Sequence, residues 1–262
     1  MNIDRAPSVA GLFYPADPAV LRRQVETLMA SVAPGPETHP KALIAPHAGY
    51  QYSGPIAASA YAQLAPIASR IRRVVLLGPA HRLPFRGLAY PAADRLLTPL
   101  GAVKLDREAL AGLSDLPQVK RLDAAFDGEH CLEVHLPFLQ TLLGDFRVVP
   151  LIVGAVAPEA VADVLERLWG GDETLIVISS DLSHYLDYAS AVRVDRDTTR
   201  AIEHLEPESL DHQGACGATP VAGLLLAARR RGLTVRTLDL RNSGDTAGPR
   251  DQVVGYGAYA VF

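Results

Sequence analysis

Two short apolar runs, each followed closely by a histidine, constrain the fold of this chain more than any other feature. Residues 43–45 precede His47, and residues 74–77 precede His81. Both runs are aliphatic and are stopped by Pro or Gly, which is typical of strands covered on both faces of a parallel sheet. Ligands of open α/β sheets bind at the carboxyl ends of the strands. The runs therefore predict neighbouring strands that deliver two imidazoles to one ligand-binding edge, where they would suit a transition metal.

A third apolar run, residues 174–178, leads into Asp181 and then His184. A carboxylate that orients an imidazole is a common arrangement for acid–base catalysis. We therefore predict that His184 moves protons and that Asp181 orients it. The alternative is that Asp181 caps a helix and His184 is an ordinary surface histidine.

Cys216 is the candidate for a third metal ligand. It lies just before an expected helix that opens at Thr219 and Pro220. Backbone N–H groups at the start of a helix stabilise a thiolate, which favours metal binding or nucleophilic reactivity. The alternative is a small buried cysteine without chemistry.

The polar stretch 127–137 contains Glu129, His130, Glu133 and His135. These side chains are predicted to support metal ligands or to line a substrate pocket, and the alternative is a set of solvated loop charges. Extended backbone would place Glu129 and Glu133 on one face, whereas a helix would make them neighbours one turn apart. Both conformations are compatible with the sequence.

Composition narrows the class of protein. The 262 residues carry 25 Lys and Arg against 29 Asp and Glu, a formal net charge of −4, and no long basic face. Nucleic acid is therefore not the expected partner, and a small molecule or a peptide is. The two cysteines imply no disulfide framework, and neither a secretory signal nor a stretch of about 20 apolar residues is found, so we expect a cytoplasmic protein without a membrane span.

Periodicity and capping signals predict alternating helices and strands in one domain over residues 1–262. The fold class is α/β, in three α/β/α layers around a mixed, largely parallel central sheet. Helices are expected at 18–32, 54–65, 106–113, 137–143, 158–168, 190–205 and 219–231, and further strands at 86–91, 147–154, 174–180, 234–240 and 253–262.

Several motifs together resemble the Memo family, in order and over nearly the whole chain. They are residues 9–15, 46–50, 78–81, 129–137, 179–184, 216–217, 242–245 and 254–258. The resemblance implies a fold similar to the class III extradiol dioxygenases, which are non-haem iron enzymes.

The same resemblance implies roles for individual residues. His47, His81 and Cys216 would line the metal position, and His184, with Asp181 beside it, would stand where the dioxygenases keep a catalytic histidine. Independently of the resemblance, we predict that Tyr50, Glu129, His130, Glu133 and His135 bind the substrate.

The implied cofactor is a transition metal ion, with iron favoured over copper and zinc. The dioxygenases use two histidines and a carboxylate, and a cysteine in place of the carboxylate shifts the preference toward copper(I), zinc or thiolate-bound iron. The predicted function is that of a metal-dependent, dioxygenase-like oxidoreductase acting on a small molecule. The alternatives are a non-catalytic ligand- or peptide-binding protein with a vestigial site, and a zinc-assisted hydrolase.

Overall fold

The computed structural model describes residues 3–33 and 39–262 of the chain. Met1 and Asn2, which belong to the stretch searched for a secretory signal, lie outside the described residues. Twelve strands in the described part form one sheet, in the order β1-β5-β6-β8-β3-β9-β2-β12-β10, with β11 on β12, β4 on β8 and β7 on β4. The strands are β1 (Asp4–Arg5), β2 (Ala42–Ala45), β3 (Arg73–Pro79), β4 (Leu88–Tyr90), β5 (Arg95–Thr98), β6 (Gly101–Leu105), β7 (Val119–Arg121), β8 (Arg147–Val153), β9 (Thr174–Ser179), β10 (His184–Leu186), β11 (Val235–Asn242) and β12 (Val253–Val261).

Four parallel strands, β8, β3, β9 and β2, form the centre of this sheet. Their residues are almost all buried, as aliphatic runs covered on both faces must be. One expectation is corrected here, because β2 and β3 are not neighbours. Strand β9 pairs with both of them and lies between, so the end of β9 reaches the sheet edge between the two histidines.

The rest of the sheet is mixed. Strand β12 runs antiparallel to β2, and β11 runs antiparallel to β12. Strands β5 and β6 form an antiparallel hairpin. The predicted mixed, largely parallel central sheet is therefore confirmed.

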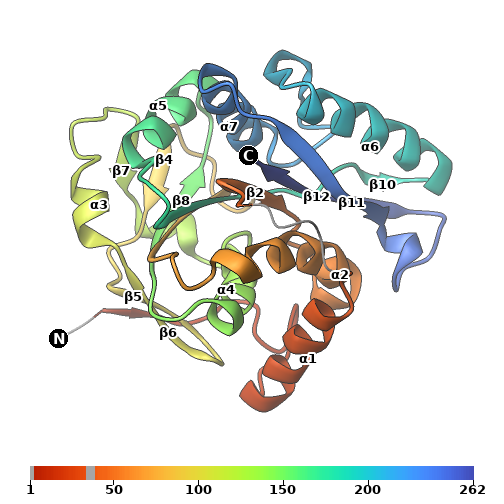
Figure 1. The fold of residues 1–262 in the computed structure, drawn as a ribbon, viewed down its shortest axis with the longest axis horizontal. Helices are drawn as coiled ribbons and strands as arrows, with labels where there is room; N and C mark the ends of the chain where they lie inside the picture. The colour runs from red at the N-terminus through yellow and green to blue at the C-terminus, as the bar shows by residue number, and fades with distance from the viewer. Residues whose placement is uncertain (1–2, 34–38) are drawn as a thin grey trace.

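Helices cover both faces of the sheet and complete the three layers (Figure 1). Helices α1, α2 and α4 pack together on one face, whereas α5 and α7 pack together on the other, with α6 over β11 and β12. The α-helices are α1 (Pro18–Ala30), α2 (Tyr50–Tyr61), α3 (Arg107–Ala111), α4 (Leu136–Leu142), α5 (Pro158–Leu168), α6 (Tyr188–Glu203) and α7 (Ala218–Arg230), and the 3₁₀ turns are η1 (Ala62–Ile67), η2 (Asp123–Phe126), η3 (Glu133–His135), η4 (Pro207–Ser209) and η5 (Ser243–Asp245).

Several helix starts differ from the expectation by one to four residues, and two of them lie next to residues of interest. Helix α2 begins at Tyr50 rather than at residue 54, because the Gly49 carbonyl already accepts the amide of Ser53. Helix α7 begins at Ala218 with Gly217 at its N-cap, so Thr219 lies inside the helix and does not cap it. Cys216 consequently lies two residues before the helix.

The polar stretch 127–137 adopts neither of the two conformations considered above. It runs through turns into η3 and then directly into α4, with Pro137 in the first turn of that helix. None of the helices in residues 3–33 and 39–262 combines the length and the apolar character that a membrane span requires.

Candidate metal centre

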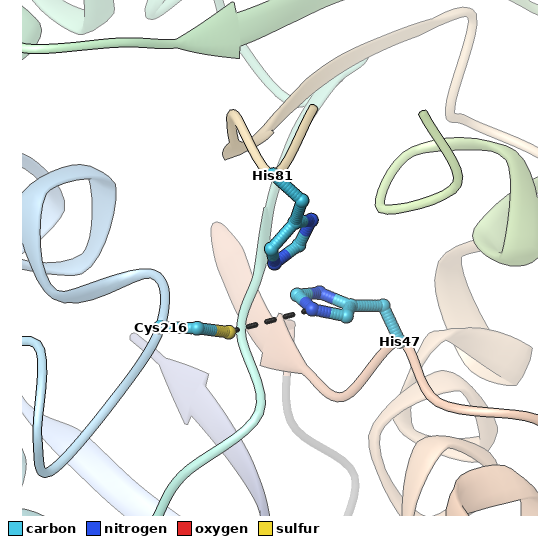
Figure 2. A group of neighbouring side chains, drawn as sticks. All are labelled: His47, His81 and Cys216. Atoms are coloured by element: carbon cyan, nitrogen blue, oxygen red, sulfur yellow. Dashed lines mark hydrogen bonds between the residues drawn. The ribbon is translucent and has the colours of Figure 1, made fainter. Parts of the chain in front are cut away.

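The side chains of His47, His81 and Cys216 converge at the carboxyl-end edge of the central strands (Figure 2). His47 follows β2, His81 follows β3, and Cys216 comes from the loop before α7. One ligand atom from each residue lies within 4.8 Å of the other two. The Cys216 Sγ is 3.4 Å from the His47 Nε2, and the two imidazole centroids are 5.0 Å apart. Two ring nitrogens and a sulfur at this spacing form a donor set that suits a transition metal ion.

His47 has one ring nitrogen committed to a hydrogen bond. Its Nδ1 lies 2.6 Å from the Ser179 Oγ, and that hydroxyl donates to the Cys131 carbonyl at 2.6 Å. Because the single hydroxyl proton is used there, Nδ1 must carry the proton of the His47–Ser179 bond. Burial, and then the nearby His81, lower the pKa of His47 well below its ordinary value. The ring is therefore neutral, and its Nε2 presents a lone pair toward Cys216.

His81 is held in the same way by a carboxylate. Its Nδ1 lies 2.9 Å from the Glu129 Oε1, and its backbone N–H donates to Oε2 of the same side chain at 2.7 Å. The carboxylate also accepts the amides of His130 and Cys131. A carboxylate on a ligand's outer nitrogen fixes the ring orientation and leaves Nε2 free for a metal.

These contacts with His81 and the backbone also change the pKa of Glu129. Burial alone would raise the pKa of its carboxyl, but the hydrogen bonds from His81 and from backbone amides outweigh burial and lower the pKa to about 2. Glu129 is therefore an anion at neutral pH, although only 6% of the residue is exposed.

The pKa of the Cys216 thiol is raised, whereas the sequence predicted a stabilised thiolate. Its thiol contacts the His47 Nε2 and the Asp181 carbonyl, at 3.4 and 3.6 Å. Burial, and then the charge of Asp181, raise the pKa of the thiol to about 12, so the predicted helix-start stabilisation of a thiolate is outweighed. A metal ion would displace the thiol proton, as it does at other cysteine ligands.

Asp181 lies beside His47. Its Oδ1 accepts the His47 backbone N–H at 2.7 Å, and its Oδ2 is 3.9 Å from the His47 Nε2. Burial raises the pKa of this carboxyl, against the lowering effect of the His47 amide and the His184 charge. No hydrogen bond within the described residues joins Asp181 to His184, so the predicted orienting role has no direct contact behind it.

His184 opens onto a polar hollow of ≈ 1000 Å³ that His81 and Cys216 also line. It starts the short strand β10, which pairs irregularly with β12 because Tyr185 has a φ of 58°. Left-handed backbone is uncommon at an aromatic residue. His184 therefore lines the same hollow as two of the candidate ligands, and its proton transfer stays a prediction.

His130 and Glu129 lie against the three converging side chains. The His130 ring stacks on His81 at 5.1 Å, with 16° between the planes, and Phe13 packs against it at 4.8 Å. The buried His130 Nδ1 has no hydrogen-bond partner in the described residues. His81, Glu129 and His130 form a second compact group of potential ligands.

The structure gives the other predicted pocket residues different partners. Tyr50 is buried and donates to the Val134 carbonyl, while the Nδ1 of His135 pairs with the Tyr61 hydroxyl at 2.7 Å. Neither residue lines a hollow beside His81 and Cys216. Their contact with a substrate stays a prediction without geometric support here.

Glu133 anchors the amino-terminal segment. Its carboxylate accepts the backbone N–H groups of Ser8 and Val9 and the hydroxyl of Tyr14. The carboxylate therefore contacts residues that lie more than a hundred positions earlier in the chain. This placement explains why Glu129 and Glu133, although close in sequence, have separate roles.

Two residues at the site, Ser179 and His212, were not predicted from the sequence. Ser179 ends β9 and fixes the His47 tautomer, but a serine at a strand end is too common to predict this contact. His212 lines both hollows beside Cys216, yet it sits in an irregular loop without a motif. The position of Ser179 follows from β9 lying next to β2, with Ala45 paired to Ser179.

Comparisons with known proteins agree with this architecture. Residues 5–260 match the family model described as Memo-like protein. A MEMO1 family protein of Methanopyrus kandleri is 35% identical over 280 residues, covering 98% of each chain. MEMO1 family proteins of Aquifex aeolicus and Ignicoccus hospitalis are 35% and 37% identical, covering 96–97% of this chain and 97% of theirs. The resemblance noted in the sequence is thereby confirmed, and the chain belongs to the Memo family.

Proposed function

We propose that this Memo family protein holds a transition metal ion through His47, His81 and Cys216 and acts as a metal-dependent oxidoreductase on a small molecule. Iron is the first candidate and copper the second. The observation that carries the proposal is the convergence of two imidazole nitrogens and one sulfur within 4.8 Å at the strand ends. Three protein ligands leave coordination positions open for a substrate.

The hydrogen bonds around the ligands support this assignment. Ser179 and Glu129 each occupy the Nδ1 of a histidine, so both rings turn the Nε2 inward. A ligand set held this way loses little freedom on binding an ion. When bound, a redox-active ion would supply electron transfer and would polarise a substrate oxygen.

The remaining roles fall to this chain's own side chains. His184 faces the polar hollow beside His81 and Cys216, and we assign to it the movement of a proton to or from a bound molecule. Asp181, buried against His47, holds the backbone of that residue and places its Oδ2 3.9 Å from the His47 Nε2.

The experiment is purification without oxygen, elemental analysis, and oxygen uptake over a panel of catechols. About one iron per chain with oxygen uptake is the expected result. Zinc without uptake would instead favour a hydrolase that activates water, and a protein without stoichiometric metal would favour a binding protein with a vestigial site.

Matched variants tie the metal to the site. Cys216→Ser should lose most of the metal, because an alcohol is a poor substitute for a soft sulfur ligand. Cys131→Ser removes the other thiol, which donates to the Pro79 carbonyl outside the ligand set, and should keep the metal. Equal occupancy in both variants would remove Cys216 from the site.

A further inference from the structure

A second hollow adjoins the polar one, because His81, His212 and Cys216 line both. It has a volume of ≈ 690 Å³ and includes His81 and Cys216 among its lining residues. Its walls are mostly apolar, because prolines and aliphatic or aromatic side chains supply them. The main contributors are Pro79, Pro84, Phe85, Val153, Val156 and Pro220. We call it the apolar hollow.

Among its described lining residues, the apolar hollow contains one arginine and no acidic side chain. No Asp or Glu lines it, and Arg86 is the one Lys or Arg among its described lining residues. Arg86 is exposed, and no carboxylate in residues 3–33 and 39–262 forms an ion pair with it, so its guanidinium is free to pair with an anion. The polar hollow is the opposite, with Asp197, Glu206 and Asp211 against Arg200. An anion would therefore be favoured on the apolar side alone.

Backbone hydrogen bonds hold the segments that form the apolar hollow. Phe85 accepts the amide of Ala155 at 2.8 Å, and Gly87 accepts the amide of Gly154 at 2.9 Å. A Cβ at Gly154 would collide with the Phe85 carbonyl, so the two segments lie as close as glycine permits. The loop that carries Arg86 is thus fixed to the end of β8. Such a preformed apolar hollow with one charged group is typical of small-molecule sites.

We propose that the apolar hollow is the substrate site of the metal centre, and that it takes a small molecule with an apolar body and a carboxylate that pairs with Arg86. This inference rests on the proposed function, since His81 and Cys216 form the shared wall. The apolar body would lie along Pro84, Phe85 and Val156. The carboxylate would gain a charge-assisted hydrogen bond from the guanidinium.

A matched pair of probes tests the charge. The dissociation constants of 4-methylbenzoate and 4-methylbenzamide, which have nearly the same shape, are measured by NMR titration at neutral pH. We expect the acid to bind about fivefold more tightly than the amide, the size of a partly exposed ion pair. Arg86→Met should remove that preference, and Arg200→Met, which changes the cation of the polar hollow, should keep it.

The measurement is made on metal-free and on metal-loaded protein. A preference seen in both forms and lost in Arg86→Met supports the proposal. Equal binding of acid and amide, or a preference lost in Arg200→Met, would overturn it. A preference confined to the loaded protein and indifferent to Arg86 would mean that the carboxylate binds the ion, which also overturns it.

A steric variant locates the probe. Ala155 lines the apolar hollow and is exposed, so Ala155→Trp should fill the space without disturbing the core. We expect this variant to lose binding of both probes and to keep its metal by elemental analysis. Retained probe binding would place the molecule elsewhere. Because metal content is measured separately, failure of the substrate assignment is distinguishable from failure of the metal centre.

Discussion

Single hydrogen bonds decide which atom each ligand in the candidate metal centre can offer. Ser179 takes the Nδ1 of His47, and Glu129 takes the Nδ1 of His81. The sequence indicated both histidines from the apolar runs that precede them. It did not indicate Ser179, because its contact arises from the order of strands in the sheet.

Removing the Ser179 hydroxyl tests whether its hydrogen bond orients the His47 ring. Ser179→Ala should weaken metal binding about tenfold to a hundredfold, since partners of this kind hold a ligand in its binding orientation. The affinity is measured by competition with a chelator of known strength, and the urea midpoint shows whether the fold is retained. Unchanged affinity in a folded variant would mean that the bond to Ser179 does not orient His47.

His184 is predicted to act in turnover and not in metal binding. His184→Ala should keep its metal content and lose any oxygen uptake, because the imidazole lines the polar hollow outside the ligand group. The matched control is His204→Ala, which removes an exposed imidazole bonded to the Arg200 carbonyl. Loss of metal from a folded His184 variant would make His184 a ligand instead.

Elements with a strong pattern were predicted well, and those that depend on distant partners were not. The buried strands β3, β8 and β9 follow from their apolar runs, and α1 from Asp17, which caps it, and Pro18. The stretch 127–137 could not be predicted, because its turns satisfy His81 and the amino-terminal segment rather than a local period. Such long-range contacts leave no periodic trace in a sequence.

Gly78, near the end of β3, tests how tightly that stretch packs on the sheet. A Cβ at this position would lie 2.7 Å from the Cys131 Sγ and 2.9 Å from the Leu132 side chain. Gly78→Ala should therefore lower the free energy of unfolding by about 1–3 kcal/mol through overpacking. Urea denaturation measures the change. Gly144→Ala, with no described heavy atom within 4 Å of the added carbon, should change it little.

The stability of the whole molecule should depend on pH through Glu129. Its pKa is about 2 in the folded chain against an ordinary 4.5, so its stabilising effect is complete above pH 4.5 and is lost as the pH falls toward 2. The shift corresponds to about 3 kcal/mol. Glu129→Gln should lower the free energy of unfolding by about this amount at pH 7, because an amide group turns donors toward the donors around it.

The pH series supplies the control for that prediction. Urea unfolding of both proteins between pH 7 and pH 2 should show a difference that shrinks as Glu129 becomes protonated in the unmodified protein. A difference that stays constant across the series would mean that the charge of Glu129 does not stabilise the fold. A carboxyl group whose pKa is lowered in the folded state stabilises the fold only while it is ionised. This stabilisation therefore disappears in acid.

The three-layer architecture followed from the sequence, and the strand ends predicted that His47 and His81 share one edge, but not that Cys216 joins them. His47, His81 and Cys216 lie far apart in the chain, and spacing alone cannot show that three segments meet. The resemblance to the Memo family supplied that grouping, and the geometry now agrees with it.

Phe13 contacts His130, and Glu133 accepts the amides of Ser8 and Val9, so the first dozen described residues cover one side of the candidate metal centre. Shortening the protein from its amino end, as is often done to obtain crystals, would uncover the imidazole of His130 to water. If a shortened protein failed to retain an ion, the cause would be the loss of this covering segment. The result would not test the ligands themselves.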